Sequence, residues 1–312
     1  MAKATTPMSP AAGDARFGAI DLALLAMVFI WGINAVVVKA TYAQIPPMAF
    51  MAIRFIVAAA LLLLVAYLFE RSLAVRRADW RMMIAVGLVG TSFYQPLFLT
   101  GLAMTTASNT ALIIATSPAF VALINRALGR ETLARRGWFG ILLAFLGIFL
   151  IIQGGGGLEL TSTMLTGDLL ILAGSFLWAL YAVMAAPLMT RYSPLRVTAL
   201  TTTIGAIPLI LIGLPAVAAL NFGNVQPSGW AGLLYSAIFA IVIAFIIWNN
   251  GVKRIGGART AFYSNLIPVV GAISAAIILG EVITPLKVAG AAIIFLGLYL
   301  ARTSKLLLAP RD

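Results

Sequence analysis

Long apolar segments separated by short polar connections fill the chain from residue 20 onward. Residues 82–125 and 197–252 contain no lysine, arginine, aspartate or glutamate. One helical crossing of a bilayer needs about 20 apolar residues, so each run is long enough for two crossings. The runs lack the alternation of membrane barrel strands, which favours helices. Ten predicted transmembrane helices cover residues 20–39, 47–69, 81–102, 107–126, 137–153, 167–188, 194–214, 229–251, 257–280 and 285–302.

The connections divide these helices into two groups of five. Residues 105–109 split the first charge-free run, and residues 221–229 split the second. Four glycines at 154–157 begin the longest predicted loop; no Lys–Ser/Thr pair follows them, which favours a flexible linker over a phosphate-binding loop. The predicted organisation is a tail at 1–19, a five-helix unit at 20–153, an external linker at 154–166, a second five-helix unit at 167–303 and a tail at 304–312.

Basic residues fall almost entirely on alternate connections. Eighteen of the 21 lysines and arginines lie in the two tails and in the connections after the second, fourth, sixth and eighth helices. Only Lys39 and Lys287 lie on the opposite side. An excess of basic residues marks the cytoplasmic side of a membrane protein, so both termini are predicted to be cytoplasmic. The net charge of +12 therefore reports topology, and we expect no nucleic-acid partner.

Composition narrows the chemistry that the chain can perform. Hydrophobic residues make up 62% of it and charged residues 10%, against roughly a quarter charged in soluble domains. Cysteine and histidine are absent, which excludes thiolate chemistry and removes the commonest metal ligand and general base. No carboxylate lies in the middle of a predicted span, and no nucleotide-binding motif is present. We therefore expect no enzyme activity, no metal, no cofactor and no ATP-driven pump.

The two five-helix units repeat each other in sequence. Equivalent residues lie 150 positions apart from the third helix onward and 147 apart in the first two helices. The matched pairs include Asp21/Asp168, Trp31/Trp178, Pro47/Pro194, Trp80/Trp230, Pro118/Pro268 and Glu131/Glu281. Because each unit has an odd number of crossings, the second must enter the membrane inverted. Inverted repeats are typical of secondary transporters, in which they support alternating access.

Several short motifs resemble a known family. They are LGRETL at 128–133 and LGEVI at 279–283, each followed by two spaced glycines, together with FIWG at 29–32 and RF at 54–55. Over about residues 20–302 the chain resembles the drug/metabolite transporter superfamily in its ten-helix form with two EamA units, and within it the YddG-type amino-acid exporters. The resemblance implies an all-α exporter of aromatic and other amino acids in a bacterial inner membrane. Arg130, which stands opposite Gly280, departs from the repeat.

Aromatic and polar residues near mid-helix are the candidates for a substrate cavity. They are Trp31, Asn34, Tyr94, Gln95, Trp178, Tyr181, Tyr263, Ser264 and Asn265. For the first helix and its repeat partner, which supply Trp31, Asn34, Trp178 and Tyr181, we favour a cavity over helix packing. For the other residues the two interpretations stay open.

Other residues mark charge, bending and packing. Arg54 is the only charged residue well inside a predicted span; it can contact a substrate carboxylate or extend outward as a structural anchor. Pro118 and Pro268 predict helix kinks, either hinges or static bends. Asp21 and Asp168 are interpreted as helix N-caps. Small residues on one face of the fifth and tenth helices predict close helix packing, at Gly140, Ala144, Gly147, Gly290 and Gly297. The contact can lie between the two halves or between subunits, and we favour the halves.

The predicted function is secondary export of small zwitterionic metabolites, chiefly amino acids including aromatic ones, by alternating access. A multidrug or metabolite exporter and a passive facilitator or channel are the alternatives. The expected partners are a small-molecule substrate and the lipid bilayer, and we expect a monomer, with a dimer as the alternative. Proton coupling, exchange and facilitated diffusion all stay open, because the only acids lie at predicted helix ends, in loops or in tails.

Overall fold

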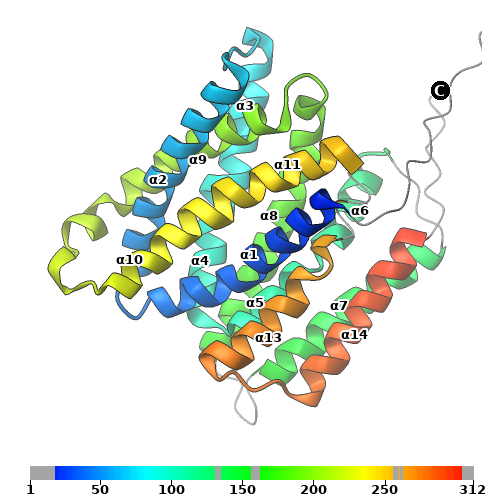
Figure 1. The fold of residues 1–312 in the computed structure, drawn as a ribbon. Coiled ribbons are helices and arrows are strands. Elements are labelled where there is room, and N and C mark those ends of the chain that lie inside the picture. Colours follow the sequence, from blue (N-terminus) through cyan, green and yellow to red (C-terminus); the bar gives the residue numbers. More distant parts are fainter. Residues whose placement is uncertain (1–17, 131–134, 156–161, 256–259, 261–262, 304–312) are drawn as a thin grey trace, which may run out of the picture.

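The computed structural model describes residues 18–130, 135–155, 162–255, 260 and 263–303, and this part of the chain is all-helical (Figure 1). The described helices are α1 (Ala19–Thr41), α2 (Pro47–Glu70), η1 (Arg77–Asp79), α3 (Trp80–Gly87), η2 (Leu88–Phe93), α4 (Tyr94–Met104), α5 (Ala107–Ile114), α6 (Ser117–Ala127), α7 (Arg135–Gly155), α8 (Ser162–Met189), α9 (Pro194–Ala218), η3 (Phe222–Asn224), α10 (Pro227–Leu234), η4 (Tyr235–Ile243), α11 (Ala244–Ile255), α13 (Ile267–Leu279) and α14 (Pro285–Thr303).

These helices form the ten crossings that the sequence predicts. Eight continuous helical stretches are long and apolar enough to span a membrane, and α13 and α14 are shorter apolar helices. The helices differ from the predicted spans mainly at their ends. α8 begins at Ser162, within the predicted linker. The first charge-free run is interrupted at residues 105–106, between α4 and α5, and again at residues 115–116, between α5 and α6. The start of the predicted ninth helix lies outside the described residues.

The two halves pack with inverted symmetry. α2 contacts its repeat partner α9, α5 contacts α13, and α7 contacts α14. α1 packs on α11 and α13 of the second half, whereas its repeat partner α8 packs on α4 and α6 of the first half. The contacts of α1 and α8 are thus counterparts with the halves exchanged, and α2–α9 and α7–α14 each pair a helix with its own repeat partner, as a pseudo-two-fold axis requires.

Matching helices are interrupted at matching places. The π-helical segments η2 and η4 lie within equivalent crossings, since residues 88–93 correspond to residues 238–243. Pro118 and Pro268 stand in the first turns of α6 and α13, directly after short breaks in the helix. Proline is tolerated at such a position because its missing N–H has no partner there. These interruptions divide the third, fourth, eighth and ninth crossings into shorter rigid pieces.

Small residues bring α7 and α14 into contact, as the sequence predicted. A Cβ atom on Gly147 would lie 2.6 Å from the Gly290 carbonyl oxygen, and one on Gly297 would overlap the Gly140 carbonyl oxygen. Ala144 is 1% exposed between them. Backbones this close leave no room for a side chain, so this pair of helices joins the two halves.

The repeat is more regular at the helix ends than the sequence suggests. Gly129 and Gly280 both have φ of 67°, the left-handed conformation in which glycine commonly ends a helix. These two glycines are therefore structural equivalents, and Arg130 is one additional residue in the first half. The Glu131 of the first motif lies outside the described residues.

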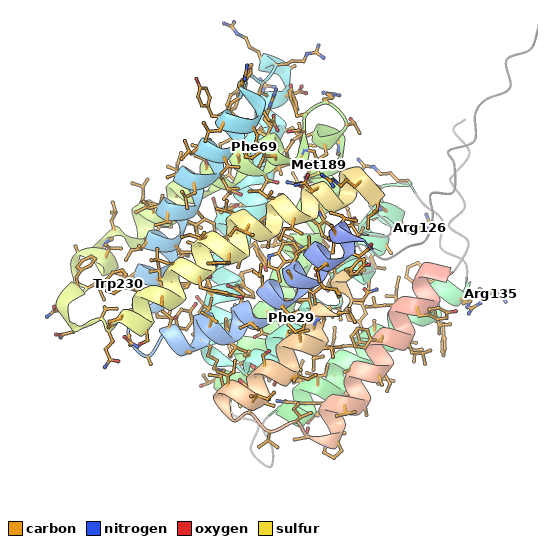
Figure 2. The ribbon with its side chains drawn as sticks, in the orientation of Figure 1. Phe29, Phe69, Arg126, Arg135, Met189 and Trp230 are labelled. Atoms are coloured by element: carbon orange, nitrogen blue, oxygen red, sulfur yellow. The ribbon has the colours of Figure 1, made fainter. Side chains whose placement is uncertain are left out.

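The ends of the helices separate the basic connections from the others. In Figure 2, Phe69, Arg126, Arg135 and Met189 lie toward one end of the molecule and Trp230 lies toward the other. We call the first the basic end and the second the distal end. The arrangement agrees with the alternation of basic connections along the chain.

Candidate functional site

Three of the predicted cavity residues meet between the halves. The ring centroids of Tyr94 on α4 and Trp178 on α8 lie 5.2 Å apart, and those of Trp178 and Tyr181 also lie 5.2 Å apart. Phe98 extends the series, with its ring 5.7 Å from Tyr94. We call Tyr94, Trp178 and Tyr181 the aromatic group. Aromatic rings of this kind can offer flat, polarisable surfaces to apolar and aromatic groups.

The π-helical segment of the third crossing makes room for this group. A Cβ atom on Gly90 in η2 would overlap the ring of Tyr181. The ring can therefore lie on the backbone of η2 only because position 90 has no side chain. Local backbone irregularity and an aromatic contact between the halves occur at the same place, which is common at functional sites.

The equivalent position in the other half is closed by hydrogen bonds. Trp31 Nε1 donates to the carbonyl oxygen of Ala240 at 2.8 Å, and Ala240 is the repeat counterpart of Gly90. The Ser236 hydroxyl donates to Asn34 Oδ1 at 2.8 Å. Trp31 also contacts the ring of Phe245, with centroids 5.6 Å apart. The polar atoms of Trp31 and Asn34 thus hold α1 against the eighth crossing.

The third predicted cluster lies apart from the aromatic group. The Tyr263 hydroxyl donates to Asp21 Oδ1 at 2.6 Å, at the start of α1. The other carboxylate oxygen of Asp21 accepts from the Gly18 N–H at 2.9 Å, which is the capping role predicted for this acid. Ser264 is half-buried and its hydroxyl has no partner among the described residues, whereas Asn265 is exposed. This geometry ties Tyr263 to a helix start.

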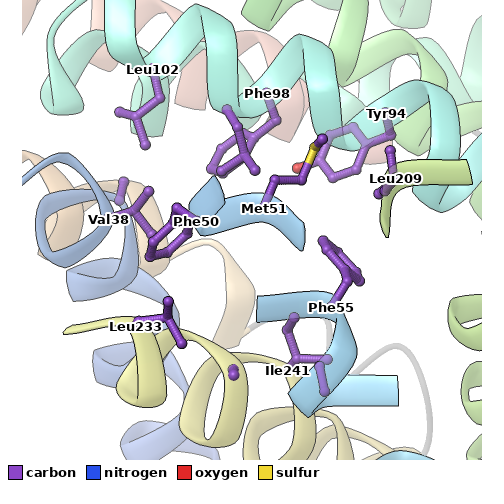
Figure 3. Packing of buried hydrophobic residues seen from close by; sticks show 14 of the residues in the cluster. Val38, Phe50, Met51, Phe55, Tyr94, Phe98, Leu102, Leu209, Leu233 and Ile241 are labelled. Atoms are coloured by element: carbon purple, nitrogen blue, oxygen red, sulfur yellow. The ribbon is translucent and has the colours of Figure 1, made fainter. Parts of the chain in front are cut away.

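Arg54 lies inside the bundle and points toward the third crossing. It is 4% exposed, and its Nη1 donates to Gln95 Oε1 at 3.4 Å. Its guanidinium carbon lies 6.0 Å and 5.5 Å from the ring centroids of Phe50 and Phe55. Figure 3 shows these two phenylalanines on α2, with Tyr94 and Phe98 of α4 across from them. Arg54 therefore faces the same helix that carries part of the aromatic group.

A second polar region, at the distal end, is built around Glu281. Its Oε1 accepts from the Ala107 N–H at 2.7 Å, and its Oε2 accepts from the Ser108 N–H at 3.0 Å and the Ser108 hydroxyl at 2.7 Å. The carboxylate thus caps the start of α5, where backbone N–H groups lack partners and the helix dipole favours negative charge. Lys39 lies 4.0 Å from Glu281 Oε1.

Asp168 and Lys287 complete this region. Asp168 is fully buried; it accepts from the Thr105 hydroxyl at 2.5 Å and from Asn109 Nδ2 at 3.1 and 3.2 Å. It is the seventh residue of α8, so the prediction that it caps its own helix is wrong: the helix starts earlier and the acid binds a different helix. Lys287 donates to the Ser108 hydroxyl at 2.9 Å.

These residues form the distal cluster, which consists of Lys39, Thr105, Ser108, Asn109, Asp168, Glu281 and Lys287. It joins α1 and α5 of the first half to α8, α14 and the end of α13 in the second. Sequence reasoning placed its acids at helix ends but did not bring them together. One signal pointed here: Lys39 and Lys287 are the two cations on the sparsely charged side.

Two inverted five-helix units are an arrangement typical of membrane transport proteins. The profile of the EamA-like transporter family matches residues 18–153 and 165–303, one match for each half. The chain belongs to the EamA-like transporter family. The resemblance to the drug/metabolite transporter superfamily is therefore confirmed.

Individual relatives agree with this assignment. A Bacillus subtilis protein named uncharacterized transporter YyaM is 30% identical over 90% of this chain and 93% of its own length. A Salmonella typhimurium protein named probable amino-acid metabolite efflux pump is also 30% identical, over 89% of this chain and 93% of its own. One solved crystal structure superposes with a TM-score of 0.63 at 20% identity, covering 91% of this chain and 96% of that one; it shares the fold.

Proposed function

We propose that this transporter exports small zwitterionic metabolites, amino acids including aromatic ones among them, by alternating access. The observation that carries the proposal is the aromatic group, whose three rings come from both halves at their interface. A site shared between the halves changes its exposure when the halves move relative to each other. The relative named as an amino-acid metabolite efflux pump supports this substrate class.

The distal cluster supplies the closure that alternating access needs. Its hydrogen bonds connect helices of both halves, so they must break before a solute can leave at the distal end. The interrupted crossings provide short helical pieces that can move without bending a whole helix. With both termini in the cytoplasm, as the basic connections predict, the distal end would face outward and the distal cluster would hold it closed.

Uptake into liposomes tests the proposal. Purified protein should transport labelled phenylalanine with saturable kinetics and show counterflow. Trp178→Ala should raise KM about fivefold, because an aromatic contact contributes about 1 kcal/mol. Trp230→Ala is the matched control, since its ring stacks on Phe222 at the distal surface and should leave KM unchanged. Linear uptake without counterflow would indicate a passive channel, and uptake equal to that of empty liposomes for every amino acid would refute this substrate class.

A further inference from the structure

We propose that Arg54 binds the carboxylate of the transported solute, so that the transporter selects organic acids and zwitterions over amines. The inference rests on the proposed function and specifies which chemical group of the solute is recognised. It follows from four properties of Arg54: its burial, its unmet hydrogen bonds, its repeat partner and its neighbours.

The guanidinium is almost completely removed from solvent, yet few of its donors are satisfied. Arg54 is 4% exposed, its one hydrogen bond to Gln95 is long at 3.4 Å, and its Nε has no partner among the described residues. A guanidinium offers five N–H donors in a fork that matches a carboxylate. A buried charge without an anion is costly, and such groups in membrane spans are functional by default.

The described acids are engaged elsewhere. Asp21 binds Tyr263 and Asp168 binds Asn109, whereas Glu281 caps α5. The two remaining acids form ion pairs at the basic end, Glu70 with Arg196 and Asp79 with Arg191. Within the part of the chain that the structure describes, the protein supplies no counter-ion for Arg54.

A neighbouring phenol does not fill this role. Tyr42, just beyond the end of α1, hydrogen-bonds to the Leu99 carbonyl oxygen at 3.3 Å. Burial raises the pKa of Tyr42 well above its ordinary value, and the opposing influence of Arg54 is smaller. Tyr42 therefore stays neutral. The rings of Phe50 and Phe55 attract the guanidinium weakly but satisfy none of its N–H donors.

The fold itself does not require an arginine at this place. The repeat counterpart of Arg54 is Thr201, which is 1% exposed. Its hydroxyl donates to the Val197 carbonyl oxygen in its own helix at 2.8 Å. The same position in the other half is thus filled by a small uncharged residue, so the packing of the helices does not itself require a charge at this position.

The neighbours of Arg54 lead to the aromatic group. Gln95, its one hydrogen-bond partner, follows Tyr94 in α4, and the Tyr94 ring lies 5.2 Å from that of Trp178. The repeat counterparts of Tyr94 and Gln95 are the apolar residues Ala244 and Phe245. Polar recognition is therefore confined to one half. A solute with a carboxylate at Arg54 and an apolar body on the aromatic group uses both features.

Equilibrium binding to the purified, full-length protein tests the inference with four probes. L-phenylalanine and 3-phenylpropionate carry the carboxylate, phenethylamine lacks it, and inorganic phosphate is a different oxyanion. The wild-type protein should bind the first two and bind phenethylamine at least about 30-fold more weakly, which is the loss typical of leaving a buried charge unpaired. Equal affinity for phenethylamine would overturn the inference without any variant, and phosphate binding as tight as that of phenylpropionate would overturn the carboxylate assignment.

Variants taken from the repeat sharpen this test. Arg54→Thr places the residue of the second half at this position and should weaken binding of both carboxylates at least about 30-fold. Arg54→Lys keeps the positive charge without the fork of N–H donors, so its affinity for the two carboxylates should lie between that of the wild type and that of Arg54→Thr. Trp230→Ala, whose ring stacks on Phe222 away from Arg54, is the control and should leave the affinity unchanged. Unchanged affinity in Arg54→Thr would overturn the inference.

The outcome for Arg54 can be separated from that of the proposed function. Saturable phenylalanine transport with an unchanged KM in Arg54→Thr would support the proposed export of amino acids and would show that Arg54 does not bind the substrate. Binding of phenylpropionate that depends on Arg54, with no transport of any amino acid, would keep the carboxylate site and remove amino acids as the substrate.

Discussion

Lys287 and Arg54 are two buried cations that the protein treats in opposite ways. Lys287 is 2% exposed and lies in a cluster with two acids, where it donates to Ser108. Arg54 is 4% exposed and meets two phenylalanine rings and one distant amide oxygen. Lys287 thus has a hydrogen-bond partner and nearby acids within the protein. Arg54 has no acid beside it within the described part of the chain, so an anion bound there would be its counter-ion.

The comparison shows how to separate a structural charge from a ligand site in this family. A charge whose partners come from the protein stabilises one conformation, so removing a partner should cost stability. A charge without partners costs stability as it stands, so removing it should weaken function and leave the fold intact or improve it. The following predictions test this division, from the largest expected effect to the smallest.

The largest loss of stability is expected for Glu281→Gln. The amide keeps one acceptor oxygen but loses the negative charge and places an N–H₂ group against the start of α5. Because the wild-type carboxylate accepts from Ala107 N–H and twice from Ser108, the variant should lose about 2–3 kcal/mol. Thermal unfolding in detergent measures this as a lower midpoint.

Glu70→Gln is the control for this substitution. Glu70 accepts only from side chains, those of Ser193 and Arg196, at the basic end of the molecule. The same chemical change there should cost about 1 kcal/mol or less. Equal losses in both variants would show that the distal cluster has no special part in holding the halves together.

Glu281→Gln should also open the distal end. The chain has no cysteine, so Ser108→Cys introduces a single thiol at a position that is 1% exposed. A membrane-impermeant maleimide should label this thiol slowly, and about tenfold faster when Glu281→Gln is added, if the cluster contributes about 1.4 kcal/mol to closure. Equal labelling rates with and without Glu281→Gln would show that Glu281 does not help to close the distal end.

Within the cluster, Lys287→Met should cost more stability than Lys39→Met. The Lys39 side chain donates to the Thr105 carbonyl oxygen and lies 4.0 Å from Glu281, but it is 29% exposed, so water can replace much of its contribution. Lys287 is buried and has a direct hydrogen bond to Ser108. We expect a loss of about 1–2 kcal/mol for Lys287→Met and less than about 1 kcal/mol for Lys39→Met, measured by the same unfolding experiment. The reverse order would show that exposure does not decide these contributions.

The sequence predicted the features that depend on spacing and repetition. Glycines on the fifth and tenth helices share one face, and the structure packs them together at Gly147 and Gly290. The predicted kinks at Pro118 and Pro268 stay predictions, although α6 and α13 both begin just before these prolines, after short breaks in the helix. The contact between Trp178 and Tyr181 also follows from helical spacing, because the residues lie three positions apart on α8.

Features that depend on tertiary placement could not be predicted. Asp168 was interpreted as a cap because hydropathy begins the sixth crossing near residue 167, whereas α8 begins at Ser162 and turns this acid toward Asn109. The partners in the distal cluster are far apart in sequence; Glu281 and Ser108, for example, are separated by 173 residues. Hydropathy could not reveal the π-helical segments, because their mostly apolar sequences show no clear helical period.

The central claim, that the unpaired arginine is kept for a ligand, is tested most directly by the unfolding midpoint of Arg54→Met with and without phenylalanine. Removing an unpartnered buried charge should leave the midpoint of the unliganded protein unchanged or raise it, and phenylalanine should no longer raise it further. If the unliganded variant instead lost as much stability as Glu281→Gln, or if phenylalanine stabilised it as much as the wild type, Arg54 would be a structural residue and the account would be wrong.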